Sequence, residues 1–283
     1  MMEVTALMDN EPAPGAAGIV AEHGLSYLVE TPGGTVLFDT GVSGAFADNA
    51  AALGKDLSSV AAAVISHHHF DHTGGLDRFF EQNDRATVYM KTGPGGNCQF
   101  RGLLLLRKDI GMNPATVNRF ENRFRVIREM TEIVPDVFLL TDIDARHPKP
   151  EGNRYLFVIR DGHPFPDDFR HELIMVVREN GALSVFTGCA HNGALNMVAT
   201  VRKQFPGEPI AAVFGGFHLV GLPMFNTMAG SASEVADIGR QLMAMTAGNV
   251  YTGHCTGKKA YATLKPVMRD RLSYFGCGAQ VQV

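Results

Sequence analysis

The feature that most constrains this chain is a group of four histidines and one aspartate within residues 67–72. The apolar run VAAAVI ends at Ile65, and Ser66 separates it from the sequence HHHFDH. A continuously apolar run of this length is typical of a strand that is buried on both faces. Imidazole and carboxylate groups are ligands for divalent transition metals. The sequence therefore predicts a metal-binding loop at the end of a central strand.

The spacing within this loop predicts which side chains share a metal ion. Residues two apart on an extended segment point to the same side, so His67 and His69 can reach one ion. Asp71 and His72 follow the point where the chain begins to turn, and they suit a second ion beside the first. His68 lies between the first two ligands and is expected to face away from the metals.

Three further apolar runs end in a short turn that carries a histidine. These runs are VFTGCAH, VFGGFH and VYTGH, which end at His191, His218 and His254. Ligands of layered α/β proteins gather at the carboxyl ends of strands, so these turns are expected to converge with the first loop. We predict that His191 and His254 complete the metal site. His218 is predicted either to bind metal or to act as an acid or a substrate-orienting group.

Four other residues carry weaker signals. Cys189 in TGCAH can supply a thiolate ligand, although a buried unreactive thiol is the commoner state of such a cysteine. Asp39 in LFDTG is predicted either to fix the tautomer of a metal-binding histidine or to cap a turn. No spacing supports a role for His23 or His171.

Two kinds of apolar periodicity alternate along the chain and predict a layered α/β fold. Strand-like runs occur near residues 4–9, 25–31, 35–41, 60–65, 172–177, 183–188, 210–216 and 249–253. Helical spacing occurs near residues 44–54, from about 75, and near 192–204, 233–245 and 258–272. We predict a single domain over residues 1–283.

The periodicity weakens between residues 94 and 168, where turn-forming clusters such as RHPKPEG and DGHPFPDD interrupt it. One polar stretch at about 118–130 is expected to be helical. We predict that residues at about 94–168 form an insertion that caps the site. Arg101, Arg107 and Lys108 in this insertion either pair with a carboxylate or phosphate of the substrate or belong to a solvated loop.

Composition excludes several classes of partner. The net charge of −4 and the absence of a Lys/Arg run argue against nucleic acid. No apolar stretch approaches the roughly 20 residues of a spanning helix, and the N-terminus lacks a secretory signal pattern, so we expect a cytoplasmic protein without a membrane partner. The four cysteines form no C-x-x-C pair, which fits a reducing compartment.

The motif SHHHFDHTGGL, with VLFDTG upstream and TGCAH and GHCTG downstream, resembles the metallo-β-lactamase superfamily over nearly the whole chain. The resemblance implies a four-layer αββα sandwich with a mono- or binuclear metal site at the rim between the sheets. It implies that His67 and His69 bind one ion with a third histidine, and that Asp71, His72 and His254 bind the other. The expected cofactor is two divalent ions, zinc first, with manganese or iron as alternatives.

Two departures from the superfamily pattern concern the remaining ligands. Many relatives have a P-G-H-T element where this chain reads DDFRHELIMVV, and many have a bridging aspartate in T-G-D where it reads TGCAH. Either His191 or Cys189 takes over one of these positions, or the site is simpler.

The stretches LMDNEP, AEHGLSYLVET, GCAHNGALN, GGFHLVG and HCTG resemble a subgroup of metal-dependent hydrolases, of which some are described as ribofuranosylaminobenzene phosphate synthases. The expected reaction is attack of a metal-bound hydroxide on an ester or phosphoester of a small, anionic molecule. Asp71 would orient the nucleophile, and His218 would protonate the leaving group or hold a substrate anion. The alternatives are phosphoribosyl transfer of the synthase type, iron-based oxygen chemistry, and non-catalytic metal or ligand binding.

Overall fold

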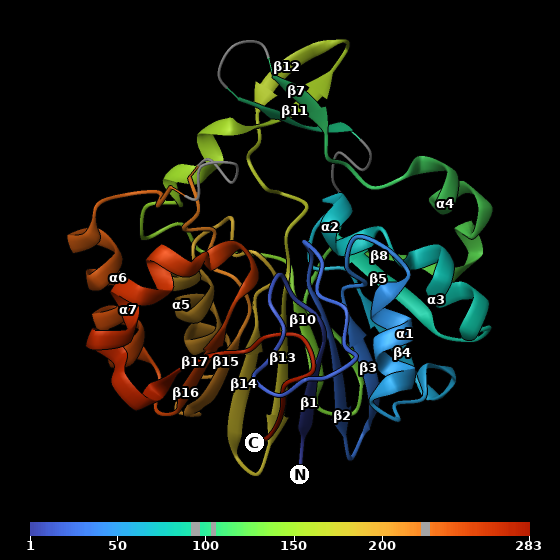
Figure 1. Ribbon diagram of the computed structural model, residues 1–283, viewed down its shortest axis with the longest axis horizontal. Helices are drawn as coiled ribbons and strands as arrows, with labels where there is room; N and C mark the ends of the chain where they lie inside the picture. The colour runs from blue at the N-terminus through green and yellow to red at the C-terminus, as the bar shows by residue number, and fades with distance from the viewer. Residues whose placement is uncertain (92–96, 103–105, 222–226) are drawn as a thin grey trace.

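Two seven-stranded sheets lie face to face in the computed structural model, which describes residues 1–91, 97–102, 106–221 and 227–283 (Figure 1). The first sheet has the order β18-β1-β2-β3-β4-β5-β8. Its strands are β1 (Glu3–Met8), β2 (Ser26–Thr31), β3 (Gly34–Phe38), β4 (Ala62–Val64), β5 (Thr87–Lys91), β8 (Phe124–Ile127) and β18 (Gln280–Gln282). The outer side of this sheet carries α1 (Ala45–Ala52), α2 (Phe70–Thr73), α3 (Leu76–Gln82) and α4 (Pro114–Arg119).

The second sheet has the order β17-β16-β15-β14-β13-β10-β9 and carries three longer helices on its outer face (Figure 1). Its strands are β9 (Thr131–Val134), β10 (Val137–Leu140), β13 (Ile174–Glu179), β14 (Ala182–Phe186), β15 (Ile210–Phe214), β16 (Asn249–Thr252) and β17 (Leu272–Tyr274). The helices are α5 (Ala194–Gln204), α6 (Ala232–Met245) and α7 (Lys258–Met268). The predicted four-layer αββα sandwich is therefore confirmed.

Alternation of side chains along the strands divides the core into three apolar layers. In β3, Val36 and Phe38 face the space between the sheets, whereas Leu37 faces the helices of the first sheet. Between the sheets, the rings of Phe186 and Phe214 stack with their centroids 4.8 Å apart. Burial of each such side chain contributes about 1.5–3 kcal/mol, so both faces of both sheets hold the sandwich together.

Parallel pairing brings the carboxyl ends of five strands to one edge of the sandwich. β3 and β4 run parallel in the first sheet, and β14, β15 and β16 run parallel in the second. The loops that follow these strands carry the histidines and carboxylates that the sequence singled out. The strand ends therefore gather at one edge, as the sequence predicted.

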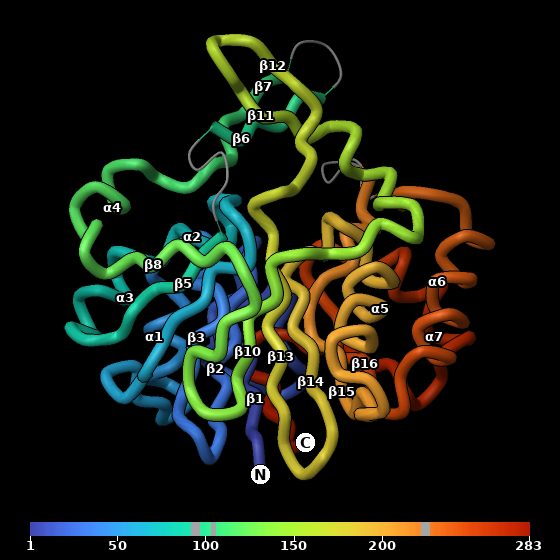
Figure 2. Tube along the Cα trace, turned by 180° about the vertical axis from the view of Figure 1, so that it is seen from behind, coloured from blue at the N-terminus to red at the C-terminus, as the bar shows by residue number. Residues whose placement is uncertain are grey.

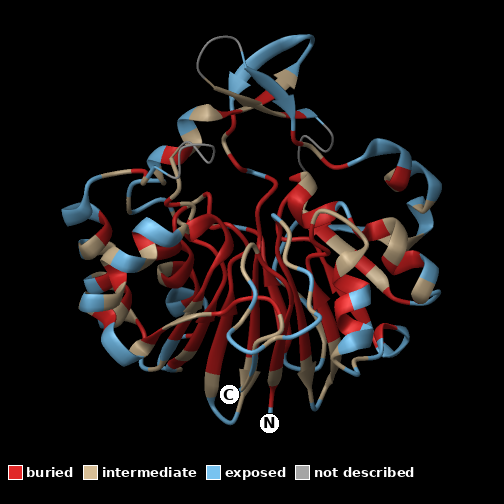
Figure 3. Cartoon of the chain, in the orientation of Figure 1, coloured by how far each residue is buried: buried red, intermediate tan, exposed pale blue. Residues whose placement is uncertain are grey.

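A third, four-stranded antiparallel sheet stands above this edge and is largely exposed (Figures 1 and 3). We call it the cap sheet; its order is β12 (His163–Pro166), β11 (Leu156–Arg160), β6 (Cys98–Arg101) and β7 (Arg107–Asp109). Figure 2 shows from behind how the chain rises into it from the two large sheets. The Phe70 N–H donates to the Ile110 carbonyl at 2.8 Å, which ties the chain beyond β7 to the histidine-rich loop.

Two expectations about the middle of the chain need correction. The helix expected at about 118–130 is wrong, because α4 ends at Arg119 and β8 pairs in parallel with β5 at the edge of the first sheet. The segment at about 94–168 is not one continuous insertion, because β8, β9 and β10 within it belong to the two large sheets. Residues 94–96 and 103–105 of that segment lie outside the described residues. The expectation that the remainder caps the site stays a prediction.

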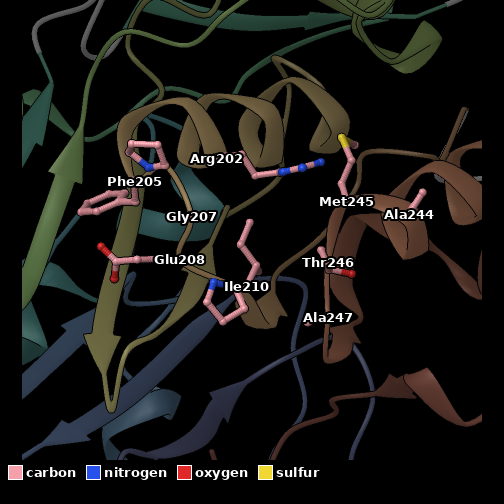
Figure 4. A pocket seen from close by; sticks show the side chains of 11 residues that line it. Arg202, Phe205, Gly207, Glu208, Ile210, Ala244, Met245, Thr246 and Ala247 are labelled. Atoms are coloured by element: carbon pink, nitrogen blue, oxygen red, sulfur yellow. The ribbon is translucent and has the colours of Figure 1, made fainter.

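A pocket of about 490 Å³ lies at the opposite end of β15 from His218 (Figure 4). It is formed by the C-terminal ends of α5 and α6 and by the chain between α5 and β15, and its charged residues are Arg202 and Glu208. This pocket is therefore separate from the histidine-rich edge. In the four described ranges of the chain, no helix combines the length and the apolar character needed to cross a membrane.

Candidate metal centre

The side chains of the candidate site come from loops that directly follow the gathered strands. β3 is followed by Asp39, β4 by the loop from His67 to His72, β14 by Cys189 and His191, β15 by His218, and β16 by His254. The backbone of these loops is unusual. Asp39, Ala190, His218 and His254 have φ angles of 60°, 55°, 46° and 44°, a region that side chains other than glycine rarely adopt. Such strained conformations cluster at functional sites.

Three imidazoles form the first group of candidate ligands. Nε2 of His67 lies 3.1 Å from Nδ1 of His69, and the ring of His191 lies 4.8 Å and 4.9 Å from the centroids of these two rings. Two ligand atoms that share one zinc ion at a tetrahedral angle are about 3.3 Å apart. The geometry of His67 and His69 therefore suits one ion. His68 points elsewhere, because its ring stacks on that of His171.

The second group contains the predicted carboxylate. Oδ2 of Asp71 lies 3.4 Å from Nε2 of His254 and 3.9 Å from Nε2 of His72. The Sγ atom of Cys189 lies 3.1 Å from the same His72 nitrogen. All four residues are buried. Imidazole, carboxylate and thiolate together are a donor set typical of zinc.

Cys189 belongs to both groups. Ligand atoms of Cys189, His67 and His191 lie within 4.8 Å of one another, and the same holds for Cys189, His72 and His254. Its sulfur thus occupies the place between the two groups. Sequence reasoning left open whether His191 or Cys189 replaces the missing superfamily ligands, and the structure places both at the site.

Hydrogen bonds fix four histidines in one tautomer. Each of them donates its Nδ1–H to an oxygen behind it, and Nε2 is the ring nitrogen that is directed into the site. The pairs are His67 with Ser66 Oγ (2.9 Å), His72 with Asp39 Oδ2 (2.7 Å), His191 with Asn153 Oδ1 (3.0 Å) and His254 with Asn10 Oδ1 (2.9 Å). The Ser66 hydroxyl can accept because it donates its own proton to Asp39 at 2.7 Å. Asp39 therefore supports a histidine, as predicted.

Two of these supporting residues were missed by the sequence analysis. Asn10 follows the end of β1, so its place at a strand end was an available signal. Asn153 lies in a 3₁₀ turn, η4 (Glu151–Tyr155), just before the cap sheet, and nothing in its local sequence indicates a role. It contacts His191 twice, because its Nδ2 also donates to the His191 carbonyl at 2.8 Å.

Burial and neighbouring charges favour the metal-binding protonation state in some of these groups, whereas burial raises the pKa of the Cys189 thiol. Burial, helped by the surrounding imidazoles, holds the pKa values of His67 and His191 well below the usual range, so both rings are neutral. Burial alone would raise the pKa of Asp71, but the charge of His72 and the imidazoles of His23 and His254 hold it well below its usual range. Burial opposes a charge on His72, but Asp39 and Asp71 raise its pKa to about 9, so this ring must lose a proton to bind a metal ion. Neutral imidazoles and an ionised carboxylate are the forms that bind metal. Nε2 of His69 and of His191 is buried without a hydrogen-bond partner among the described residues.

The remaining candidate histidines lie at different distances from the two groups. The ring of His218 is 4.2 Å from that of His191, and its half-buried side chain lies near Cys189 and Cys255. Nε2 of His23 lies 3.2 Å from Oδ2 of Asp71, although no sequence spacing pointed to it. His171 stands behind the site, because Nδ1 accepts the His68 N–H and Nε2 donates to Asp167.

The three basic residues proposed as anion partners lie on the cap sheet. Lys108 is nearest to the metal-binding loop, with its ammonium 4.5 Å from the centroid of the Phe70 ring. Arg101 donates to Gln99 and lies over Phe157, and Arg107 is exposed in β7. Of the three, only Lys108 is placed beside the loop that carries the histidines.

Support of His191 by Asn153 leads to a testable prediction. Substitution of such a supporting residue typically lowers metal affinity 10–100-fold. We expect Asn153→Ala to weaken zinc binding by about that factor, measured by competition with a chromophoric chelator. Asn249→Ala is the control, because the Asn249 side chain is exposed, lies away from the histidines, and donates to the Tyr251 hydroxyl. Equal zinc affinities for the two variants would contradict the supporting role.

A sandwich of two mixed sheets with a strand-end cluster of histidines defines a layered α/β protein with a candidate metal centre. Residues 20–95 match the family model of the metallo-β-lactamase superfamily. The structure superposes with a TM-score of 0.82 on Tm1679, a metal-dependent hydrolase of the β-lactamase superfamily. That protein is 30% identical in sequence, and the match covers 100% of this chain and 99% of the other. The chain belongs to the metallo-β-lactamase superfamily.

Two further comparisons extend this relationship. A relative from Methanocaldococcus jannaschii is 26% identical over 257 residues, which are 85% of this chain and 83% of the relative. Its name is 7,8-dihydropterin-6-methyl-4-(β-D-ribofuranosyl)-aminobenzene-5′-phosphate synthase. Zn²⁺-bound PqqB from Methylobacterium extorquens shares the fold, with a TM-score of 0.57 at 11% identity over 99% of this chain and all of that one.

Proposed function

We propose that this protein is a metal-dependent hydrolase that cleaves an ester or phosphoester bond in a small, anionic molecule. The observation that carries the proposal is the set of histidines whose Nδ1 atoms are occupied and whose Nε2 atoms converge on one buried space. The first ion would be held by His67, His69 and His191, and the second by Asp71, His72 and His254. Cys189 would be shared between the two.

Two divalent ions at this site would lower the pKa of a water molecule to about 7 and neutralise the negative charge that develops on the substrate. Zinc fits the mixture of imidazole, carboxylate and thiolate donors best. Asp71 accepts hydrogen bonds and can orient the attacking water. His218 lies beside His191 at the half-buried side of the site, where it can protonate the leaving group.

The substrate is expected to carry negative charge. The first residue of α2 is Phe70, which directly follows His69, and the Lys108 ammonium lies over the Phe70 ring. Lys108 can therefore reach a phosphate or carboxylate near the metals. The Lys149 ammonium donates to the Asp168 carbonyl and lies over the Phe169 ring. The Phe169 ring in turn stacks on that of His191. These contacts place two cations around the site.

A second candidate function is synthesis by phosphoribosyl transfer. The relative from Methanocaldococcus jannaschii favours a synthase, because its name describes the synthesis of a ribofuranosyl aminobenzene phosphate that carries a dihydropterin-methyl group. In that reaction an aromatic amine would replace water as the nucleophile. Its ring carbon para to the nitrogen would form the bond to the sugar carbon, the original substituent of the sugar would leave with its electron pair, and the carboxyl group of p-aminobenzoate would leave as carbon dioxide.

One assay separates the two functions. The zinc-loaded protein is incubated with p-nitrophenyl esters and phosphoesters, and separately with a phosphoribosyl donor and p-aminobenzoate. Release of p-nitrophenol that disappears in Asp71→Asn supports the hydrolase. An amine-dependent ribosyl product without hydrolysis would replace it with the synthase, and tight substrate binding without turnover of either kind would indicate a binding protein.

A further inference from the structure

We propose that His23 is a detachable ligand of the second metal position, and that an anionic oxygen of the substrate takes its place. The inference rests on the metal site of the proposed function. His23 lies in the connection between β1 and β2, outside the H-x-H-x-D-H loop. Neither its spacing from other histidines nor a position at the carboxyl end of a parallel strand assigns His23 a role.

The position of the His23 imidazole matches that of a ligand. Its Nε2 lies 3.2 Å from Asp71 Oδ2, and its ring centroid is 5.1 Å from that of His254. Ligand atoms of the three residues all lie within 4.8 Å of one another. The separation from Asp71 is close to the value of about 3.3 Å expected for two ligands on one zinc ion, and close to the 3.4 Å between Asp71 and His254.

The backbone beside His23 is fixed to the metal-binding loop. The N–H of Leu25 donates to the Asp71 carbonyl at 3.2 Å. A Cβ atom at Gly24 would lie 2.7 Å from that same carbonyl oxygen, so only glycine fits between the two segments. His23 is thus held next to Asp71 by the chain itself.

The side chain of His23, by contrast, is less buried and has fewer contacts than the other two rings. It is 53% exposed, whereas the side chains of His72 and His254 are 0% exposed. The other two rings are fixed through Nδ1 by Asp39 and Asn10, but the described residues provide no hydrogen bond to Nδ1 of His23. A half-exposed ring that is held through one nitrogen and one ring contact can rotate away at the cost of its contacts with Asp71 and the His254 ring.

The number of metal-binding atoms around the second position indicates what rotation of the His23 ring could do. Asp71, His72, His254 and Cys189 already provide four donor atoms, and zinc takes four or five ligands. His23 would supply a fifth donor to an ion held there, and rotation of its half-exposed side chain would leave room for another ligand. A phosphate or carboxylate oxygen is the ligand most suited to replace a neutral imidazole there, because it brings negative charge to the cation.

The experiment uses the full chain loaded with Co²⁺, whose visible absorption reports coordination number, and inorganic phosphate as the probe. We compare the wild type, His23→Ala and His23→Gln. His163→Ala is the matched control, because His163 is an exposed histidine on β12 of the cap sheet. The glutamine variant keeps a donor for Asp71 but is a poor metal ligand, so it separates a ligand from a hydrogen-bond donor.

We expect both His23 variants to keep the wild-type number of cobalt ions, to absorb more intensely in the visible region, and to bind phosphate several-fold more tightly. Phosphate should change the wild-type spectrum toward that of phosphate-bound His23→Ala. If His23→Gln behaves like the wild type, His23 acts only as a hydrogen-bond donor to Asp71. If either variant loses a metal ion, His23 is a permanent ligand. Either result, or unchanged spectra, overturns the inference alone, whereas a wild type that binds no cobalt overturns the metal site itself.

Discussion

Replacement of His67 by alanine is expected to remove one of the two metal ions and to lower turnover by about 10³-fold. The His67 ring is fully buried, its Nδ1–H is held by Ser66, and its Nε2 contacts His69. Loss of a catalytic ion removes several kcal/mol of transition-state stabilisation, and each 1.4 kcal/mol corresponds to a tenfold change in rate.

The measurement is the metal content per mole of protein together with the rate of ester or phosphoester hydrolysis. His68→Ala is the matched control from the same loop, because the His68 ring turns toward His171 and away from the site. The control is expected to keep both ions even if it unfolds at a lower temperature. A His67→Ala protein that retains two ions and wild-type turnover would refute the assignment of this group.

The spacing of apolar residues predicted those helices and strands whose sequence follows either the helical or the strand period throughout. α5 and α6 occur where helical spacing placed them, and β13 to β16 occur at the predicted apolar runs. The region after α4 was misread, because β8 is an edge strand whose Arg125 and Val126 are exposed, so its sequence looks polar and not strand-like. Its pairing with β5 depends on a contact between distant segments that no local period records.

The same distinction applies to the candidate site. His67, His69, Asp71 and His72 were predicted together because the strand period and the following turn determine where they point. The loops of His191 and His254 were predicted from their place after parallel strands. Asn153 could not be predicted in this way, because its contact with His191 depends on the path of the chain between the second sheet and the cap sheet.

Replacement of Cys189 by aspartate is expected to change the metal preference of the site. Thiolate ligands favour zinc, and carboxylates suit manganese, so the substitution exchanges a soft shared donor for a hard one. Aspartate is also the residue that many superfamily members have at the corresponding T-G-D position, so the site is expected to accept it. We expect the ratio of bound manganese to bound zinc to rise on the order of tenfold in competition, which corresponds to about 1.4 kcal/mol of differential binding.

Cobalt provides an independent readout, because a sulfur ligand gives near-ultraviolet charge-transfer absorption that a carboxylate lacks. The Cys189→Asp protein should lose this absorption while keeping its ions. Cys277→Ser is the matched control, because Cys277 is buried near Asn49 and the Leu7 carbonyl, away from the histidines. If Cys189→Asp retains both the absorption and the zinc preference, sulfur is not a ligand, and the two ions must be joined by another group. If Cys189→Asp loses the absorption and the zinc preference while Cys277→Ser keeps both, the sulfur of Cys189 is a metal ligand. It then explains how a chain without the superfamily's bridging aspartate can hold two metal ions.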